Sequence, residues 1–303
     1  MIASESHSFS DVQPTSQADV DPTGLPRYLT SIIASPLGWV QDDEDKELIW
    51  NLASRRLSEK SGRTAMGDMT RTFQVPSGTG SITISIHEPA LTEDNLGFKT
   101  WVSSYILAKQ LYELKPPAPT VPEDDMMVLE LGAGTGLVGI AAAALWNVPV
   151  IMTDLPEIEP NLAKNVTLNS LRRLAGGSAS LKSGVLDWTS PQKLHVRERH
   201  GAALQKVPSG TKATTILAAD SLYSVLHPKV LAQTIKFWLS QDASARVMLA
   251  NPQRAAYAQQ RDELFCLLCE LGLEVMAQGT EIGRDDWAEE VSVSWQVWRW
   301  RRH

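Results

Sequence analysis

The sequence has few of the features of secreted, membrane or nucleic-acid-binding proteins. Its 303 residues include two cysteines, too few for a disulfide framework. No apolar run approaches the ~20 residues that cross a bilayer, and the Ser/Asp-rich start lacks a charged-then-apolar signal pattern. The net charge of −7 is opposite in sign to that of a phosphate-binding surface. We therefore expect a cytoplasmic protein, with nuclear entry left open, whose primary partner is neither a membrane nor a nucleic acid.

Two local patterns could suggest other functions. Cys266 and Cys269 have C-x-x-C spacing, but they lie in the apolar, helix-periodic LFCLLCELGL with no second Cys/His pair nearby. We interpret them as small hydrophobic residues of a core helix and predict no metal site. The tryptophan-rich VSVSWQVWRW could stack on bases, but its apolar residues alternate from Val291 to Val297. Such alternation indicates a half-buried strand.

The chain divides into three predicted segments. Residues 1–23 are polar and aperiodic and predict a disordered tail. Residues 24–122 predict helices, a β-hairpin at about 71–88, a helix from Trp101 to Leu114 and a proline-rich connector. In residues 123–303 strands alternate with helices, which indicates a mostly parallel, doubly wound sheet.

The expected fold is α/β, a Rossmann-like sheet with a helical and β-hairpin extension at its N-terminal side. Seven strands are expected in this sheet, and the last is inserted antiparallel because no helix separates it from the strand before. The polar residues 189–213 have no clear period and are expected to form a long surface loop.

A glycine-rich turn follows the first strand of this region, in VLELGAGTGLVGI. Gly132, Gly134 and Gly136 would let the backbone approach a ligand that a Cβ atom would block. The spacing G-x-G-x-G is not the G-x-G-x-x-G of a pyrophosphate site. Glu130 precedes the turn, where it can accept hydrogen bonds from a cationic amino-acid group, and Asp154 ends the next strand, placed to accept from both ribose hydroxyls. Acid, glycine turn and second acid predict a site for S-adenosylmethionine, a nucleoside with an amino-acid tail.

The third strand ends in Leu186, Asp187 and Trp188. Asp187 could accept a hydrogen bond from the exocyclic amine of adenine, while Leu186 and Trp188 cover the ring. This tripeptide alone fits a structural role equally well, but beside the glycine turn we favour the adenine site.

The fourth strand ends in AADSLYS, which brings Asp220 and Tyr223 to the same edge of the sheet. Methyl transfer to an amine needs a neutral nitrogen lone pair in line with the sulfonium carbon. Asp220 would orient the amine by accepting its N–H bonds and Tyr223 would wall the channel, so that alignment and desolvation accelerate the reaction. Alternatively, these residues cap the following helix. Leu155, beside Asp154, and Ala219, beside Asp220, complete the candidate cofactor-binding residues.

Together these motifs resemble the seven-β-strand protein-lysine N-methyltransferases, the group that includes the methyltransferase-like 21 and elongation factor lysine methyltransferases. The similarity runs from about Arg71 to Trp300 through LTEDNLGFKTWVSSYILAKQL, ELGAGTGLVGI, TDLP, VLDW and D-x-x-Y. It implies that Asp220 and Tyr223 are the family's Asp-x-x-Tyr pair, and that Gly97 and Trp101 border the methionine end of the cofactor. The family's other cofactor positions correspond to Glu130, Gly132, Asp154 and Trp188.

Within this group, LSEKSGRTAMGD and LGFKTW are most similar to fungal members that act on translation elongation factor 2. The resemblance implies a protein substrate, with an elongation factor as the expected one, and we expect the enzyme to be a monomer. Two departures lie near where a protein substrate would dock. Ser221 and Leu222 replace a pair that is often bulkier and β-branched, and the loop 189–213 is longer than the common core requires.

Two alternatives remain. A small-molecule methyltransferase acting on a hydroxyl would use a His general base near the fourth strand, but His227 begins a helix as His-Pro and is interpreted as structural. A non-catalytic cofactor-binding scaffold has no physical need for all three acids at the strand ends. Asn251 and Arg254, which end the fifth strand, either contact substrate or form a turn.

Overall fold

The structure is a computed structural model that describes residues 25–61, 68–78, 80–90, 96–117, 127–170, 180–198, 201–284 and 290–301. The chain forms two compact units, Met1–Ser61 and Gly62–His303. The predicted tail, residues 1–23, lies outside the described residues. The predicted segments 24–122 and 123–303 stay a prediction about chain organisation, and the first of them contributes residues to both units.

The N-terminal unit contains two helices, α1 (Leu25–Ala34) and α2 (Asp43–Ser61), which confirms the helical prediction for this region. Three acidic residues in the first turn of α2 favour its start, because carboxylates are stabilised at the positive end of a helix dipole. The Trp50 indole N–H donates to the Ser35 carbonyl oxygen at 3.0 Å and so ties α2 to the end of α1.

The second unit begins with an antiparallel hairpin of β1 (Met69–Ser77) and β2 (Gly80–Glu88), paired from Met69↔Glu88 to Ser77↔Gly80. This confirms the predicted hairpin. Phe73, Val75, Ile82, Ile84 and Ile86 are buried in the core of the unit. The hairpin is therefore packed on the same core as the main sheet.

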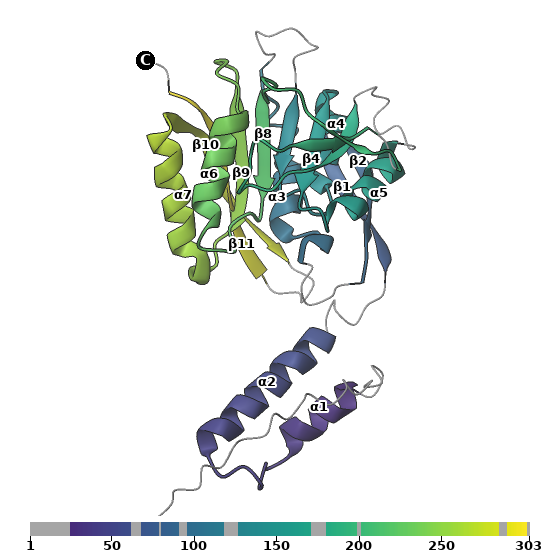
Figure 1. The fold of residues 1–303 in the computed structure, drawn as a ribbon, viewed down its shortest axis with the longest axis vertical. Coiled ribbons are helices and arrows are strands. Elements are labelled where there is room, and N and C mark those ends of the chain that lie inside the picture. Colours follow the sequence, from purple (N-terminus) through teal and green to yellow (C-terminus); the bar gives the residue numbers. More distant parts are fainter. Residues whose placement is uncertain are drawn as a thin grey trace, which may run out of the picture. The chain divides into compact units, whose positions relative to one another are not determined.

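Among the described residues, the main sheet has nine strands in the order β10-β11-β9-β8-β3-β4-β5-β6-β7 (Figure 1). Its parallel centre pairs β3 with β4 and β8, β4 with β5, and β8 with β9. As predicted, the last strand, β11, is inserted antiparallel, between β9 and β10. The bounds are β3 (Val128–Leu131), β4 (Val150–Asp154), β5 (Leu181–Val185), β6 (His195–Arg197), β7 (Leu204–Lys206), β8 (Thr215–Ala219), β9 (Arg246–Pro252), β10 (Leu273–Arg284) and β11 (Glu290–Trp300).

The prediction of an unstructured loop over 189–213 is wrong in part. Two short strands from this stretch, β6 and β7, continue the sheet antiparallel beyond β5. Arg197 of β6 holds this extension in place, because its guanidinium bonds both oxygens of the buried Glu159 carboxylate at 2.8 Å. The fold class is as predicted, with two strands more than the expected seven.

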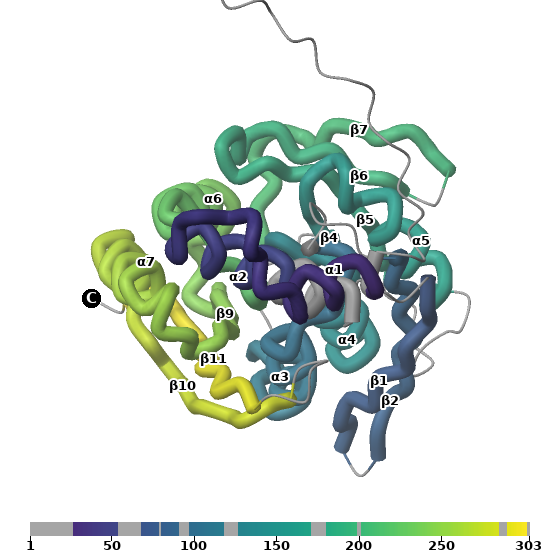
Figure 2. Tube along the Cα trace, turned by 90° about the horizontal axis from the view of Figure 1, so that it is seen from below, coloured from purple at the N-terminus to yellow at the C-terminus, as the bar shows by residue number. Residues whose placement is uncertain are grey.

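Helices cover both faces of the sheet (Figure 2). One face packs against α3 (Val102–Gln110), α4 (Leu137–Trp146), α5 (Glu159–Ser170) and the hairpin, and the other against α6 (His227–Trp238) and α7 (Ala258–Glu270). Two 3₁₀ turns, η2 (Leu96–Phe98) and η5 (Ala255–Tyr257), complete the described elements. None of the helices in the described ranges is both long and apolar enough to cross a bilayer.

The tryptophan-rich strand is part of the core, as its alternation predicts. In β11, Val293 and Val297 are buried on one face, and Trp298 is fully buried on the other, with its ring 5.0 Å from that of Phe265. The prediction for the cysteines is only half right. Both lie on α7 with free thiols, but Cys266 is exposed while Cys269 packs against the core.

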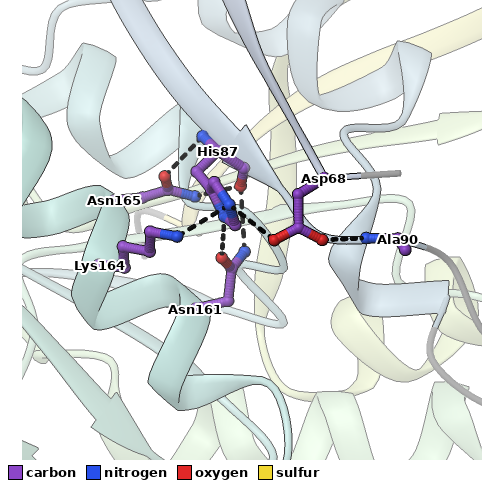
Figure 3. Close-up of polar contacts among 6 residues, drawn as sticks. All are labelled: Asp68, His87, Ala90, Asn161, Lys164 and Asn165. Carbon is purple, nitrogen blue, oxygen red and sulfur yellow. Dashed lines mark hydrogen bonds and ion pairs between the residues drawn. The ribbon is translucent and has the colours of Figure 1, made fainter. Parts of the chain in front are cut away.

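Three asparagines of α5 bind backbone groups of β2, and Figure 3 shows two of them, Asn161 and Asn165, at His87. Asn165 accepts from the His87 N–H at 2.7 Å and donates to the His87 carbonyl oxygen at 3.0 Å, and Asn169 bonds both backbone groups of Ser85 in the same way. Asn161 also donates to the His87 carbonyl oxygen, at 3.2 Å. We call Asn161, Asn165 and Asn169 the asparagine ladder. The ladder satisfies backbone groups that a neighbouring strand would otherwise bind.

Candidate active site

The candidate active site lies where β3, β4, β5 and β8 end. These strands are parallel, so their carboxyl ends meet at one edge of the sheet. The chain runs from β3 to β4 on one side, while β8 lies on the other side of β3. Ligands of doubly wound sheets bind in the crevice at such a reversal of strand order.

The glycine turn between β3 and α4 needs its glycines. Gly132, Gly134 and Gly136 have φ of 66°, 56° and 86°, in the left-handed region that side chains disfavour. A Cβ atom at Gly136 would lie 2.6 Å from Leu162 Cδ1, and one at Gly134 would lie 3.1 Å from the Gly97 carbonyl oxygen. The predicted turn is therefore present, and Gly97 lies against it.

Asp154, at the end of β4, is bonded to this turn. Its Oδ2 accepts from the Gly134 N–H at 2.7 Å, and its Oδ1 accepts from the Leu155 N–H at 2.8 Å. Burial raises the pKa of Asp154 to about 6, although these two bonds favour the carboxylate. The group is thus mostly ionised at neutral pH. Leu155 follows it with 37% of its surface exposed.

The protonation state of Glu130 differs from the one that its predicted role requires. Its carboxyl is almost fully buried, and Oε2 accepts a 2.9 Å hydrogen bond from the Gly139 N–H in α4. Burial raises its pKa to about 8, so the group is largely protonated at neutral pH. A bound ammonium group nearby would lower this pKa. Binding of a cationic amino-acid group by Glu130 stays a prediction.

Trp188, at the end of β5, covers the glycine turn. Its Cζ2 atom lies 3.0 Å from where a Cβ of Gly132 would be. Leu186 is buried, whereas Asp187 is exposed and accepts from both the N–H and the hydroxyl of Thr189 at 2.8 Å. Of the predicted adenine-site residues, Trp188 is the one that the structure brings against the turn.

Asp220, which follows β8, has a strained backbone and an unsatisfied side chain. Its φ of 55° is in the left-handed region, and its N–H donates to the Ala250 carbonyl oxygen at 2.8 Å. Its Oδ2 is buried and has no hydrogen-bond partner among the described residues. Burial raises the pKa of Asp220, while the nearby Ser103 hydroxyl and the cations Arg254 and Lys99 lower it.

The surroundings of Asp220 contain further buried hydroxyls. The Ser221 N–H donates to Asn251 Oδ1 at 3.2 Å, and Ala219 is buried beside Ala250 of β9. Within the described ranges, Ser221 Oγ is also buried without a hydrogen-bond partner, and the buried Ser103 hydroxyl is near the Asp220 carboxyl. Buried polar groups are normally satisfied, so this end of β8 has capacity for a polar ligand.

Trp101, which precedes α3, contacts Lys99 and Arg254, the same two cations that lower the pKa of Asp220. Lys99 Nζ lies 4.5 Å from the centre of the Trp101 ring, and the Arg254 guanidinium carbon lies 5.9 Å from it. Sequence reasoning missed Lys99 and Ser103, although both flank Trp101 at alternate positions in KTWVS. Lys99 is only 3% exposed, and no pattern in the sequence indicates that this lysine is buried.

Tyr223 lies three residues after Asp220, in the segment that follows β8. It is 56% exposed, and burial together with the Asp154, Asp220 and Glu157 carboxylates raises its pKa. Its ring packs edge-on against His227, with centroids 4.3 Å apart. The structure therefore brings together the residues predicted to hold the cofactor and the pair predicted to orient the acceptor.

This geometry suits a nucleoside with an amino-acid tail. The turn offers a cradle that a Cβ would fill, Asp154 offers a carboxylate for hydroxyls, and Trp188 offers an aromatic face. No three His, Cys, Asp or Glu side chains of the described residues are grouped so that they could hold a metal ion. Fold and site together define the class of Rossmann-like, S-adenosylmethionine-dependent methyltransferases.

Comparison with known proteins narrows this class. Residues 79–269 match the family described as lysine methyltransferase, and the chain belongs to that family. The resemblance found in the sequence motifs is thereby confirmed, as are the α/β fold class and the S-adenosylmethionine-dependent methyltransferase class.

Two fungal relatives are similar over most of this chain. Protein-lysine N-methyltransferase EFM2 of Saccharomyces cerevisiae is 37% identical over 80% of this chain and 57% of its own. Protein-lysine N-methyltransferase rrg1 of Schizosaccharomyces pombe is 29% identical over 100% of this chain and 97% of its own. The chain thus spans little more than half the length of the first relative and nearly all of the second.

Proposed function

We propose that this chain transfers the methyl group of S-adenosylmethionine to a lysine side chain of a protein. The observation that carries the proposal is the pair of unlike carboxylates at the ends of β4 and β8, the two strands that flank β3. Asp154 is bonded to the glycine turn, whereas Asp220 is buried with one oxygen unsatisfied. Both carboxylates are close enough to Tyr223 to raise the pKa of its phenol.

The donor side of the site is formed by the glycine turn, Asp154 and Trp188. Asp154 would accept hydrogen bonds from the ribose hydroxyls, and Trp188 would cover the adenine. Trp101 and Glu130 would border the methionine end. When bound, the cofactor supplies an electrophilic methyl group on its sulfonium.

The acceptor side is formed by Asp220 and Tyr223. Asp220 Oδ2 would accept an N–H bond from the substrate amine and thereby aim the nitrogen lone pair at the methyl group. The raised pKa of Asp220 favours a proton on this carboxyl, and the positive charge of an arriving ammonium would favour its loss. Tyr223 would exclude water from one side of the channel.

The finer assignment concerns the substrate. We propose a translation elongation factor, on the resemblance of LSEKSGRTAMGD and LGFKTW to fungal enzymes of that kind. We further propose that the enzyme acts as a cytoplasmic monomer. The net charge of −7 suits a basic target.

A small-molecule methyltransferase is the second candidate, because the structure brings His227 next to Tyr223. A histidine at this position could act as the general base that methylation of a hydroxyl needs.

The test combines two measurements. Isothermal titration of S-adenosylhomocysteine into the purified protein should give micromolar binding. Radiolabelled S-adenosylmethionine should then label one protein band in a fractionated lysate, on lysine. Label found only in the small-molecule fraction would favour the second candidate, and absence of binding would overturn the proposal altogether.

A further inference from the structure

Three aromatic rings connect the glycine turn to the acceptor side of the site. The Trp188 ring covers Gly132, and its centroid lies 5.5 Å from that of His227 at 75°. The His227 ring in turn meets Tyr223 at 4.3 Å and 83°. Both contacts are edge-to-face, the geometry that aromatic rings favour. His227 is thus the middle ring of the series.

The backbone that carries Asp220 fixes the His227 ring. Its Nδ1 lies 3.0 Å from the carbonyl oxygen of Ser221, the residue after Asp220. Because a carbonyl oxygen only accepts, Nδ1 carries the hydrogen of this bond. Burial lowers the pKa of His227, which supports a neutral ring with its proton at Nδ1.

Tyr223 depends on this ring for its position. More than half of its surface is exposed, and among the described residues His227 is the aromatic ring that packs against it. His227 also starts α6, where Pro228 in the first turn restricts the backbone. The phenol is therefore placed by a side chain whose own orientation is set by a hydrogen bond and a helix start.

We propose that His227 is a positioning residue that holds Tyr223 at the acceptor edge and couples its position to Trp188. Cofactor binding against Trp188 then orders the acceptor side through the edge-to-face contacts of the three rings. The inference rests on the proposed function for the roles of Trp188 and Tyr223, and adds a residue that the sequence pattern marked only as a helix start.

Three variants test the aromatic ring of His227 and its Nδ1 hydrogen bond separately. His227→Phe keeps both edge contacts and loses the Nδ1–H donor, His227→Asn keeps a donor and loses the ring, and His227→Ala loses both. His195→Ala is the matched control, because His195 Nδ1 also meets a backbone carbonyl oxygen, that of Lys193 at 3.2 Å, on β6.

The first readout needs no methylation substrate. The chain has five tyrosines, so 3-fluorotyrosine labelling gives a small ¹⁹F spectrum in which Tyr223→Phe identifies the Tyr223 signal. We expect this signal to move furthest in His227→Ala and His227→Asn, less in His227→Phe, where the ring remains without its hydrogen bond, and not at all in His195→Ala. Adding S-adenosylhomocysteine should shift it in the wild type and His227→Phe but not in His227→Ala.

The second readout is lysine methylation in the labelled lysate fraction. We expect His227→Ala to lower kcat at least tenfold while the Kd of S-adenosylhomocysteine changes less than threefold, and His227→Phe to retain most activity. An unmoved Tyr223 signal in His227→Ala would overturn the proposal. So would a His227→Phe variant as inactive as His227→Ala, because the imidazole nitrogens would then be needed for the chemistry itself. Failure of the wild type to bind S-adenosylhomocysteine would instead refute the proposed function.

Discussion

The two halves of the site differ in how completely the fold satisfies them. On the donor side, three glycines take the positive φ angles, and the Glu130 and Asp154 carboxyls accept backbone N–H bonds. On the acceptor side, a non-glycine residue, Asp220, takes the positive φ and keeps a buried oxygen without a partner among the described residues. The donor half is complete as folded, whereas the acceptor half is left for a ligand to complete.

This difference suggests that residues on the acceptor side lower the stability of the fold in a way that serves function. Strain and unsatisfied polar groups persist where the surrounding structure enforces them, and they gather at functional sites. If so, substitutions on the acceptor side should lower activity without lowering stability, and those on the donor side should lower cofactor affinity.

The largest effect is expected for Asp220→Asn. Asparagine tolerates the left-handed backbone, so the fold should persist, but the neutral amide no longer attracts the substrate's positive charge and no longer offers the carboxylate oxygen that orients the neutral amine for attack. We expect lysine methylation to fall at least ~100-fold, or about 3 kcal/mol in activation free energy. The Kd of S-adenosylhomocysteine should stay within about threefold, since the donor half is untouched. Asp262→Asn, on the exposed side of α7, is the control. Full activity in Asp220→Asn would remove the acceptor half from the mechanism.

The next largest effect is expected for Asp154→Ala on cofactor affinity. Loss of a charged acceptor of two hydroxyl bonds should weaken S-adenosylhomocysteine binding by about 2–3 kcal/mol, measured by titration calorimetry. Asp187→Ala should cost only about 1 kcal/mol, because the exposed Asp187 already bonds Thr189. Equal losses in the two variants would contradict the placement of the ribose at Asp154.

Cofactor affinity should also depend on pH in a defined direction. The pKa of Asp154 is raised to about 6, so the carboxylate gains a proton as the pH falls through 6 and accepts fewer hydroxyl bonds. We expect the Kd of S-adenosylhomocysteine to rise about tenfold between pH 7.5 and pH 5. Asp154→Asn alone should reduce this change, and in Asp154→Asn combined with Glu130→Gln it should disappear, because the Glu130 carboxyl, with a pKa of about 8, also gains protons over this range. A dependence that survives in the double variant would assign the titration to another group.

The smallest effect is on stability, and it should have opposite signs in the two halves. Asp220→Gly removes a side chain from a left-handed backbone and should raise the free energy of unfolding by about 1 kcal/mol. Gly134→Ala does the reverse at φ 56° and should lower it by about 1 kcal/mol. Urea unfolding measures both. A destabilised Asp220→Gly would show that the strained backbone is not a cost to the fold.

Much of this site was readable from the sequence because its chemistry follows strand ends. The positions of Glu130, Asp154 and Asp220 depend only on where parallel strands stop and on glycines that break the pattern. The last strand was predictable too, since VSVSWQVWRW alternates over a long stretch, and its antiparallel direction was expected because no helix precedes it. A long alternating segment still predicts a strand when single residues depart from the alternation.

Features that depend on tertiary contacts could not be predicted. The strands β6 and β7 have three residues each, too few for a period of two, and the Arg197–Glu159 pair that holds them joins residues 38 positions apart. Lys99 and Ser103 enter the site only because the turn before α3 packs against the end of β8. In the sequence, His227 is recognisable as the start of a helix. Its contacts with the rings of Trp188 and Tyr223 depend on the tertiary fold.

The asparagine ladder has a consequence for how the hairpin tolerates change. Four residues of helix rise ~6 Å and two residues of strand ~6.6 Å, so the amides of Asn165 and Asn169, four positions apart on α5, meet the alternate residues His87 and Ser85 of β2. The Asn165 and Asn169 bonds at His87 and Ser85 go to the main chain, so these two amides can still bind when the side chains there are exchanged. Exchange of His87 would lose the contact of its Nδ1 with Asn161 Oδ1 at 2.8 Å and that of its Nε2 with Lys164. An inserted or deleted residue, however, would put the amides opposite the wrong backbone groups. This attachment therefore constrains the length of the hairpin far more than its composition.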